Sequence, residues 1–195
     1  MNQVKKKIIV GASIVFSLIM IVSAAEYFGT RILDQSFAIG ASNILDGDND
    51  YAVLQYAGFS SLRCPGGNFI DTNDSCKFTE GNETYQLQGW VMVDLMTNNT
   101  GIYNVSEMQF NASELNIGCS NCSDSTSFRV FTTTDWQNTS TVWTHQGRCK
   151  INDNEHTICS FTIANEYMEA FVAARTNIDN SRPDPAIRWA KIIAP

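Results

Sequence analysis

Histidine and basic side chains are scarce in this sequence. It contains two histidines, and its 13 Lys and Arg residues are outnumbered by 20 Asp and Glu, which gives a net charge of −7 over 195 residues. The histidines, His145 and His156, leave little material for a histidine-rich metal site or for acid–base catalysis. A nucleic-acid binder would need a clustered basic surface, so the acidic balance argues against that class.

Catalytic signatures are also missing from the sequence. No G-x-S-x-G, H-E-x-x-H or phosphate-loop motif occurs, and no hydrolase-like order of Ser, His and Asp is visible. Two of the 20 acidic side chains could still converge into a glycoside-hydrolase pair, which sequence does not test. We nevertheless expect a protein that binds a partner and is not an enzyme.

The first 25 residues have the composition of an export signal. Three lysines, Lys5 to Lys7, precede an uncharged apolar run of 18 residues, Ile8 to Ala25. That length is near the lower limit for a transmembrane helix and slightly long for a signal-peptide core. Residues 1–25 are therefore either a signal peptide cleaved just ahead of Glu26 or a hydrophobic helix that anchors the chain. Both alternatives place the rest of the chain outside the cell, where it would carry a net charge of −10.

Seven N-x-S/T triplets within 66 residues support an extracellular location. So many acceptor motifs in an exported chain predict a heavily N-glycosylated surface, whose glycans would occupy exposed side chains. The predicted glycosylation sites are Asn73, Asn82, Asn98, Asn104, Asn111, Asn121 and Asn138.

Six cysteines follow the export segment, an even number that predicts disulfides in an oxidising compartment. Fifteen connectivities are possible, and we favour local pairs: Cys64 with Cys76, Cys149 with Cys159, and therefore Cys119 with Cys122. The last two have the C-x-x-C spacing of redox and zinc motifs. No second C-x-x-C completes a zinc site, and the flanking sequence does not predict the strand and helix of a thioredoxin motif, so we interpret them as a structural disulfide.

From residue 51 onward the sequence has the alternation of β-strands. Eight β-rich segments are separated by clusters of Asn, Asp, Gly, Ser and Thr, which favour turns. They are residues 51–56, 85–96, 102–110, 127–132, 141–145, 157–163, 169–175 and 187–193. The pattern predicts an all-β antiparallel sandwich or barrel in one domain, residues 42–195. A helix competes with strand only over residues 164–174.

Residues 26–45 have no clear period because Gly29 and Gly40 interrupt their apolar residues. A short helix, a strand and an extended linker all remain open for this stretch. We treat residues 26–41 as a linker or an exposed N-terminal segment.

Four sequence motifs resemble the discoidin-type domains, the galactose-binding-like jelly rolls that also occur as coagulation-factor C domains and carbohydrate-binding modules. The first two are ASNILDGDNDYAVL and GWVMVDLMTNNTGIYNVSEMQF, in which Trp90, Val93, Asp94, Leu95, Ile102 and Val105 fall on family positions. The others are SFRVFTTTDWQNTSTVW, with Asp135 and Trp143, and the closing stretch EAFVAARTNIDNSRPDPAIRWAKIIAP. The resemblance covers about 150 residues. It departs from the family where Asp135 is followed by Trp136, and in its cysteine framework.

The resemblance implies an antiparallel jelly-roll β-sandwich that binds ligands with exposed aromatic and Arg side chains on loops at one end. A sugar ring would stack on an aromatic face while polar groups orient its hydroxyls. We expect Trp136 to be the main ligand contact, with weaker candidates in Tyr103, Arg63 and Phe69. Trp90 and Trp143 are expected to be core residues, and the alternation around Asp94 predicts that Val91, Val93 and Leu95 face the core.

An acidic turn at Asp46, Asp48 and Asp50 is a candidate calcium site. Calcium requires six to eight oxygen ligands, and three carboxylates on alternate positions around Gly47 could supply several. Family members often hold a structural cation in this loop with an acid near the carboxyl terminus. The final strand has no acid here, so that ligand is either missing or replaced by Asp184. A solvated acidic turn is the competing interpretation.

Two functions are compatible with these features. The first is an extracellular binding or adhesion module for carbohydrate or a cell-surface protein. The second is a structural subunit of a surface filament or coat, in which residues 26–45 add a strand to a neighbour's sheet.

Overall fold

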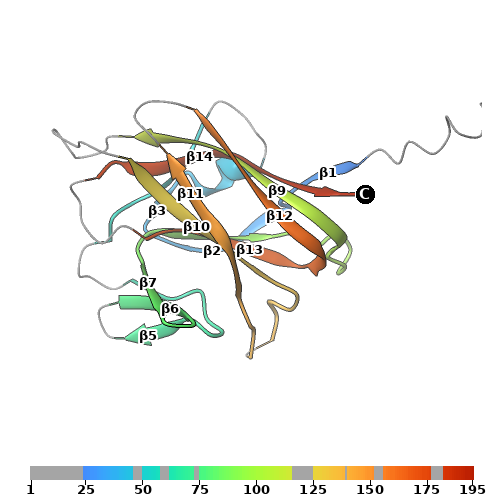
Figure 1. The fold of residues 1–195 in the computed structure, drawn as a ribbon, viewed down its shortest axis with the longest axis horizontal. Helices are drawn as coiled ribbons and strands as arrows, with labels where there is room; N and C mark the ends of the chain where they lie inside the picture. The colour runs from blue at the N-terminus through green and yellow to red at the C-terminus, as the bar shows by residue number, and fades with distance from the viewer. Residues whose placement is uncertain are drawn as a thin grey trace, which may run out of the picture.

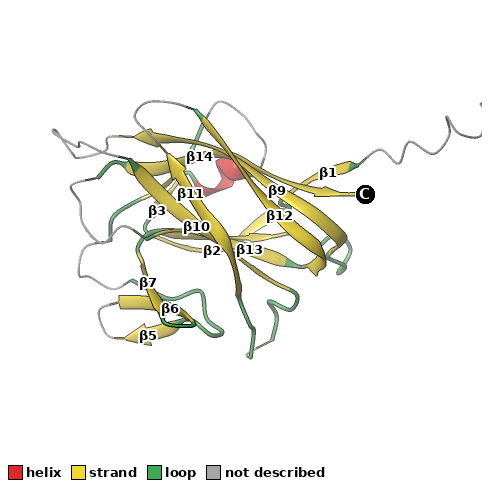
Figure 2. Ribbon diagram, viewed as in Figure 1, coloured by secondary structure: helices red, strands yellow, loops and turns green. Residues whose placement is uncertain are grey.

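The computed structural model describes residues 24–45, 50–57, 62–72, 75–115, 125–138, 140–151, 156–176 and 182–195. Two antiparallel sheets, A and B, face each other across a core, and a smaller sheet C lies below sheet B in Figure 1. The described residues contain one short 3-10 helix, Ala41–Ile44, and are otherwise strands and loops (Figure 2). The predicted all-β antiparallel sandwich is confirmed. The predicted N-terminal hydrophobic helix lies outside the described residues, within which no helix is long and apolar enough to cross a membrane.

Sheet A has the strand order β12-β9-β14-β4-β3, with β1 also paired to β14. Its strands are β1 (Ala25–Phe28), β3 (Ala38–Ile39), β4 (Ala52–Leu54), β9 (Ile102–Leu115), β12 (Thr157–Met168) and β14 (Asp184–Ala194). Sheet B has the order β11-β10-β13-β8-β2. Its strands are β2 (Arg31–Ser36), β8 (Trp90–Asp94), β10 (Thr126–Thr133), β11 (Thr144–Ile151) and β13 (Ala170–Arg175). Sheet C consists of β5 (Ile70–Thr72), β6 (Ser75–Glu80) and β7 (Glu83–Leu87).

Strand β8 faces two hydrophobic cores. Val91, Val93 and the following Leu95 belong to the core between sheets A and B, as their alternation predicted. On the other face, Trp90 and Met92 pack into a second core with side chains of sheet C. The face of β8 that was expected to be mixed is therefore covered as well, and every residue of the strand is buried.

The two tryptophans expected in the core are buried, and both belong to the second core. Trp90 is 0% exposed and Trp143 is 2% exposed. The indole nitrogen of Trp90 donates a hydrogen bond to the backbone oxygen of Arg63 at 2.7 Å. Trp143 is held through its backbone nitrogen, which donates to Asn68 Oδ1 at 2.8 Å. The indole nitrogen of Trp143 is buried without a hydrogen-bond partner among the described residues, so this side chain anchors the layer between sheets B and C through its apolar contacts.

The two predicted disulfides that fall on described residues are confirmed. Cys64 is bonded to Cys76, which attaches the loop before β5 to strand β6. Cys149 is bonded to Cys159, which joins β11 of sheet B to β12 of sheet A. The predicted pair of Cys119 and Cys122 lies outside the described residues.

Most of residues 26–41 lie in strands β1, β2 and β3, so this stretch is not a linker, although many of its side chains are exposed. Strand β1 pairs with β14 in sheet A, and β2 pairs with β8 in sheet B. Gly29, which interrupts the apolar pattern, lies where the chain crosses between the sheets. A Cβ at this position would lie 2.2 Å from Val93 Cγ1, so the crossing requires glycine. In this structure the segment completes the sheets of its own chain.

Two further strand boundaries differ from the expectation. Residues 85–96 were expected as one strand but form two, because the chain passes from sheet C to sheet B at Gln88 and Gly89. A Cβ on Gly89 would lie 2.3 Å from the Phe37 carbonyl oxygen, which leaves room only for glycine. The helix that competed over residues 164–174 does not form, because β12 pairs with β9 and β13 pairs with β8 and β10.

A buried ion pair joins the two main sheets. Arg175, at the end of β13, is 0% exposed, and its Nη1 donates to Asp184 Oδ1 at the start of β14. Its Nη2 donates to the backbone oxygen of Arg182 at 3.2 Å. A guanidinium in such a place is tolerated because a carboxylate compensates its charge.

We predict that Asp184→Asn destabilises the fold by about 3–5 kcal/mol, because it removes the charge of the carboxylate that bonds to the buried Arg175 guanidinium. Urea unfolding followed by tryptophan fluorescence measures the loss. The matched control is Asp71→Asn in β5, an exposed carboxylate whose neutralisation should cost less than about 0.5 kcal/mol. Equal midpoints for the two variants would contradict the role assigned to the ion pair.

Candidate ligand-binding site

Four connections between strands meet at one end of the sandwich, which we call the loop end. They are residues 29–30, residues 95–101, the described residues 134–138 and 140–143, and Glu169. Backbone hydrogen bonds tie them together: Thr30 N donates to Asp94 O at 2.7 Å, and Leu95 N donates to Glu169 O at 2.8 Å. Glu169 N in turn donates to Thr133 O at 3.0 Å, just before the β10–β11 connection. The loop end is therefore a connected surface that draws on both sheets.

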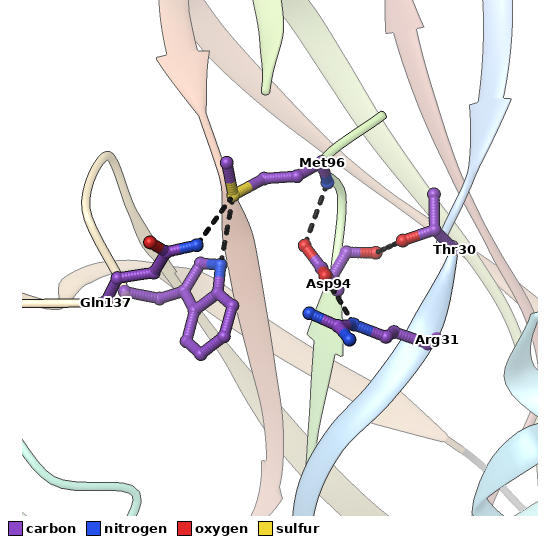
Figure 3. A network of polar contacts seen from close by, with 6 residues as sticks. Thr30, Arg31, Asp94, Met96 and Gln137 are labelled. Atoms are coloured by element: carbon purple, nitrogen blue, oxygen red, sulfur yellow. Dashed lines mark hydrogen bonds and ion pairs between the residues drawn. The ribbon is translucent and has the colours of Figure 1, made fainter. Parts of the chain in front are cut away.

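The buried carboxylate of Asp94 holds two parts of the loop end in place. It is buried at the end of β8, where its Oδ2 accepts from Arg31 Nε at 2.8 Å. Its Oδ1 accepts from the backbone nitrogen of Met96 at 2.9 Å, which sets the start of the 95–101 loop (Figure 3). Thr30 Oγ1 donates to the Asp94 carbonyl at 3.2 Å. One buried acid thus fixes an exposed Arg side chain and a loop.

Trp136 lies on one side of the 95–101 loop. Its side chain is half-buried, and its indole nitrogen contacts Met96 Sδ at 3.2 Å. Gln137 Nε2 approaches the same sulfur at 3.8 Å (Figure 3). The guanidinium carbon of Arg31 lies 6.0 Å from the centre of the Trp136 ring, so the cation held by Asp94 is next to the indole. Trp136 is an aromatic surface held in place by its neighbours.

Tyr103 lies at the start of β9, beyond the other end of the same loop. Its side chain is 63% exposed, and its ring packs on that of Tyr167 with centroids 4.6 Å apart. The Tyr167 hydroxyl accepts from Gly101 N at 3.0 Å and donates to Glu169 Oε1 at 2.9 Å. Burial raises the pKa of Tyr167, and the bond to Glu169 adds to this effect, so the hydroxyl stays a donor at neutral pH. The exposed Tyr103 ring is therefore supported by a fixed partner.

Next to Tyr103 is a cavity of about 340 Å³. The side chains that surround it include two exposed aromatic rings, Tyr27 and Tyr103. They also include three hydrogen-bonding groups, those of Thr97, Thr100 and Asn104. Its volume is in the range of small-ligand sites, and no charged side chain of the described residues contributes to its wall. Aromatic faces beside hydroxyl groups suit a neutral, hydroxyl-rich ligand.

The structure brings two of the predicted ligand residues to the loop end and separates the others. Trp136 and Tyr103 both contact or flank the 95–101 loop. Arg63 lies elsewhere, beside the far half of β2, where it pairs with Asp34 at 2.8 Å. Phe69 is wrong as a ligand contact, since it is only 6% exposed in the second core.

Three contributors to the loop end were missed from the sequence: Arg31, Met96 and Tyr167. Arg31 lies in the stretch whose period was unclear, and Tyr167 in the one where a helix competed with a strand. The available signal was the family-like Asp94, because a buried carboxylate requires a partner and Arg31 is that partner.

The candidate calcium site is only partly described. Asp46 and Asp48 lie outside the described residues, and Asp50 is exposed. Asp184, the possible distant ligand, is bound instead to Arg175. Over the part of the chain that the structure describes, no group of three His, Cys, Asp or Glu side chains could hold a metal ion. A cation at the acidic turn therefore stays a prediction from sequence.

Comparisons with known proteins identify the fold. No protein-family model and no curated protein matches the sequence. A truncated AlyQ with CBM32 and alginate lyase domains matches over 87% of this chain at 12% identity and a TM-score of 0.50, and this chain spans 33% of its length. The C-terminal domain of a chitobiase from Bacteroides fragilis matches over 86% of this chain and 96% of its own, at 12% identity and a TM-score of 0.51. The structural neighbours include carbohydrate-binding modules, and the predicted galactose-binding-like, discoidin-type sandwich is confirmed as the fold.

The predicted glycosylation sites differ in accessibility. Asn82, Asn98, Asn104 and Asn138 are exposed, whereas Asn73 and Asn121 lie outside the described residues. Asn111 is half-buried in β9, paired with Ile158 on one side and Trp189 on the other. Its Oδ1 atom is buried and accepts no hydrogen bond from the described residues. A glycan on Asn111 would have to leave the middle of a sheet.

We predict that Asn111 carries no glycan, because its amide lies within a central strand, while the exposed asparagines are modified. Peptide mass spectrometry of the chain secreted from a eukaryotic host, with and without enzymatic deglycosylation, measures occupancy at each site. Asn104, seven residues earlier on the same strand and exposed, is the internal control. Equal occupancy at Asn111 and Asn104 would contradict the register of β9.

Proposed function

We propose that this chain is a carbohydrate-binding module whose ligand lies on the loop end of the sandwich. The observation that carries the proposal is the pair of aromatic side chains on either side of the 95–101 loop. Trp136 is held by Met96, and Tyr103 is supported by Tyr167. Aromatic faces beside fixed hydrogen-bonding groups are what recognition of a sugar requires, because its C–H face is apolar and its hydroxyls are polar.

The loop end is organised before any ligand arrives. Trp136, Arg31 and Tyr103 each have a partner within the protein, so few rotatable bonds remain to be fixed on binding. Arg31 uses its Nε for Asp94, and its side chain is 65% exposed, which leaves the terminal nitrogens as donors to ligand hydroxyls. Thr97 and Thr100 supply neutral polar groups on the other side of the loop.

The proposal places the module on the outside of the cell, as an N-glycosylated surface protein that binds without catalysis. Two disulfides and four exposed acceptor asparagines support this setting. A carbohydrate partner is favoured over a surface protein because the loop end offers small clusters of aromatic and hydroxyl groups. Neutral glycans are the first ligands to test.

We predict that Trp136→Ala and Tyr103→Ala each weaken glycan binding about tenfold or more, since each removes a stacking surface. A glycan array identifies the ligand, and isothermal titration calorimetry measures its affinity for each variant. Tyr51→Ala is the matched control: this aromatic residue stacks on His156 at the opposite end of the sandwich and should leave affinity unchanged.

The outcomes separate the parts of the proposal. Parent-like affinity in both Trp136→Ala and Tyr103→Ala would place the ligand away from the loop end. Failure of the natively folded chain to bind any glycan on the array would contradict the carbohydrate function itself.

A further inference from the structure

A second cavity, of about 390 Å³, lies between sheet C and the outer side of sheet B. It is separate from the loop end, because its walls come from the middle of β6, β7, β10 and β11 and from Thr176, which follows the far end of β13. The side chains that form it include three cations and three neutral polar groups: Lys77, Arg129, Arg148, Thr84, Tyr85 and Gln86. No carboxylate of the described residues contributes to its wall.

The concentration of positive charge is unusual for this chain. Only ten Lys and Arg residues follow residue 25, against 20 acidic residues, yet three of the ten surround this cavity. Arg129 and Arg148 are direct register partners on the neighbouring strands β10 and β11. Like charges directly opposite each other in an antiparallel sheet are destabilising. A local conflict of this kind, kept without an ion pair to either arginine among the described residues, is typical of a functional site.

Arg129 is held in place by two contacts, which do not use all of its N–H donors. Its guanidinium carbon lies 3.6 Å from the centre of the Tyr85 ring, and its Nη1 lies 3.0 Å from His145 Nε2. Its Nε is buried without a hydrogen-bond partner among the described residues. Burial lowers the pKa of Arg129 and Arg148 adds to this effect, whereas Tyr85, Glu83 and Glu80 act in the opposite direction.

The nearest carboxylates are engaged by neutral partners. A guanidinium can only donate, so His145 Nε2 accepts from Arg129 and His145 Nδ1 carries the hydrogen that it donates to Glu80 at 2.8 Å. The Tyr85 hydroxyl donates to Glu83 Oε2, and this bond is the main cause of the raised pKa of Tyr85. Lys77, Arg129 and Arg148 form no ion pair with any carboxylate that the structure describes.

We propose that this cavity binds the carboxylate or sulfate group of an acidic saccharide. Three converging cations match a compact anion with several oxygens, and the Thr84 hydroxyl and Gln86 amide can bond to sugar hydroxyls. Arg129 covers one face of the Tyr85 ring, so recognition here depends on charge rather than on stacking. The saccharide part of this inference rests on the proposed function, whereas the anion site rests on the cavity alone.

Calorimetric titration of the full chain tests the inference with trigalacturonate, a sulfated galactose trisaccharide and neutral galactotriose. At least one acidic probe should bind more tightly than galactotriose, with an affinity that falls steeply between about 50 and about 500 mM salt. Arg148→Gln and Lys77→Gln should each weaken acidic binding about tenfold or more. Both residues are at least partly exposed, so these variants should fold. Arg188→Gln on β14 of sheet A is the charge-matched control and should bind as the parent does.

Three results would overturn the inference. The first is affinity for the acidic probes within about twofold of the parent in both Arg148→Gln and Lys77→Gln. The second is binding of inorganic sulfate or a hexaglutamate peptide as tightly as the acidic sugars, which would remove the saccharide assignment. The third is loss of acidic binding in Trp136→Ala with none in Arg148→Gln, which would return the anion to the loop end. Because neutral glycans are measured separately, failure at the loop end is distinguishable from failure here.

Discussion

Burial of sheet B on both faces is the constraint from which the rest of the structure follows. Its central strands, β8, β10 and β13, are almost entirely buried, with sheet A on one side and sheet C on the other. Such strands need apolar side chains at successive positions, which is why residues 90–93 read as a continuous apolar run. With both faces packed, sheet B is a rigid platform, and its strand ends hold the connections that can vary.

The two candidate sites use this platform differently. At the loop end, Asp94 is the last residue of the buried strand β8. Its carboxylate accepts hydrogen bonds from Arg31 and from the backbone of Met96, which fixes the Arg31 side chain and the start of the 95–101 loop. At the second cavity, side chains on the outer side of sheet B meet those of sheet C, and cations from both sheets form the wall. Aromatic rings characterise the first site and positive charge the second. A ligand with both a neutral and an acidic sugar would have complementary chemistry at each.

Local sequence signals predicted a large part of this arrangement. The close spacing of Cys64 with Cys76 and of Cys149 with Cys159 indicated their pairing, and the alternation around Asp94 placed Val91 and Val93 in the core. Signals that depend on pairing between distant strands could not be seen in this way. Gly29 interrupts the apolar pattern where the chain crosses between sheets, so β1 and β2 were not recognised from the sequence. Arg129 and Arg148 are neighbours only because of the register between β10 and β11. Arg63 showed the same limit, since its residue type suited a ligand site that its position does not reach.

The most direct measurement of the central claim is a crystal structure of the chain with an oligosaccharide identified by array screening. The account predicts that a sugar ring lies in van der Waals contact, about 4 Å, with the ring of Trp136 or Tyr103, with its hydroxyls bonded to groups of the loop end. A sugar bound only at a surface remote from both rings would contradict it.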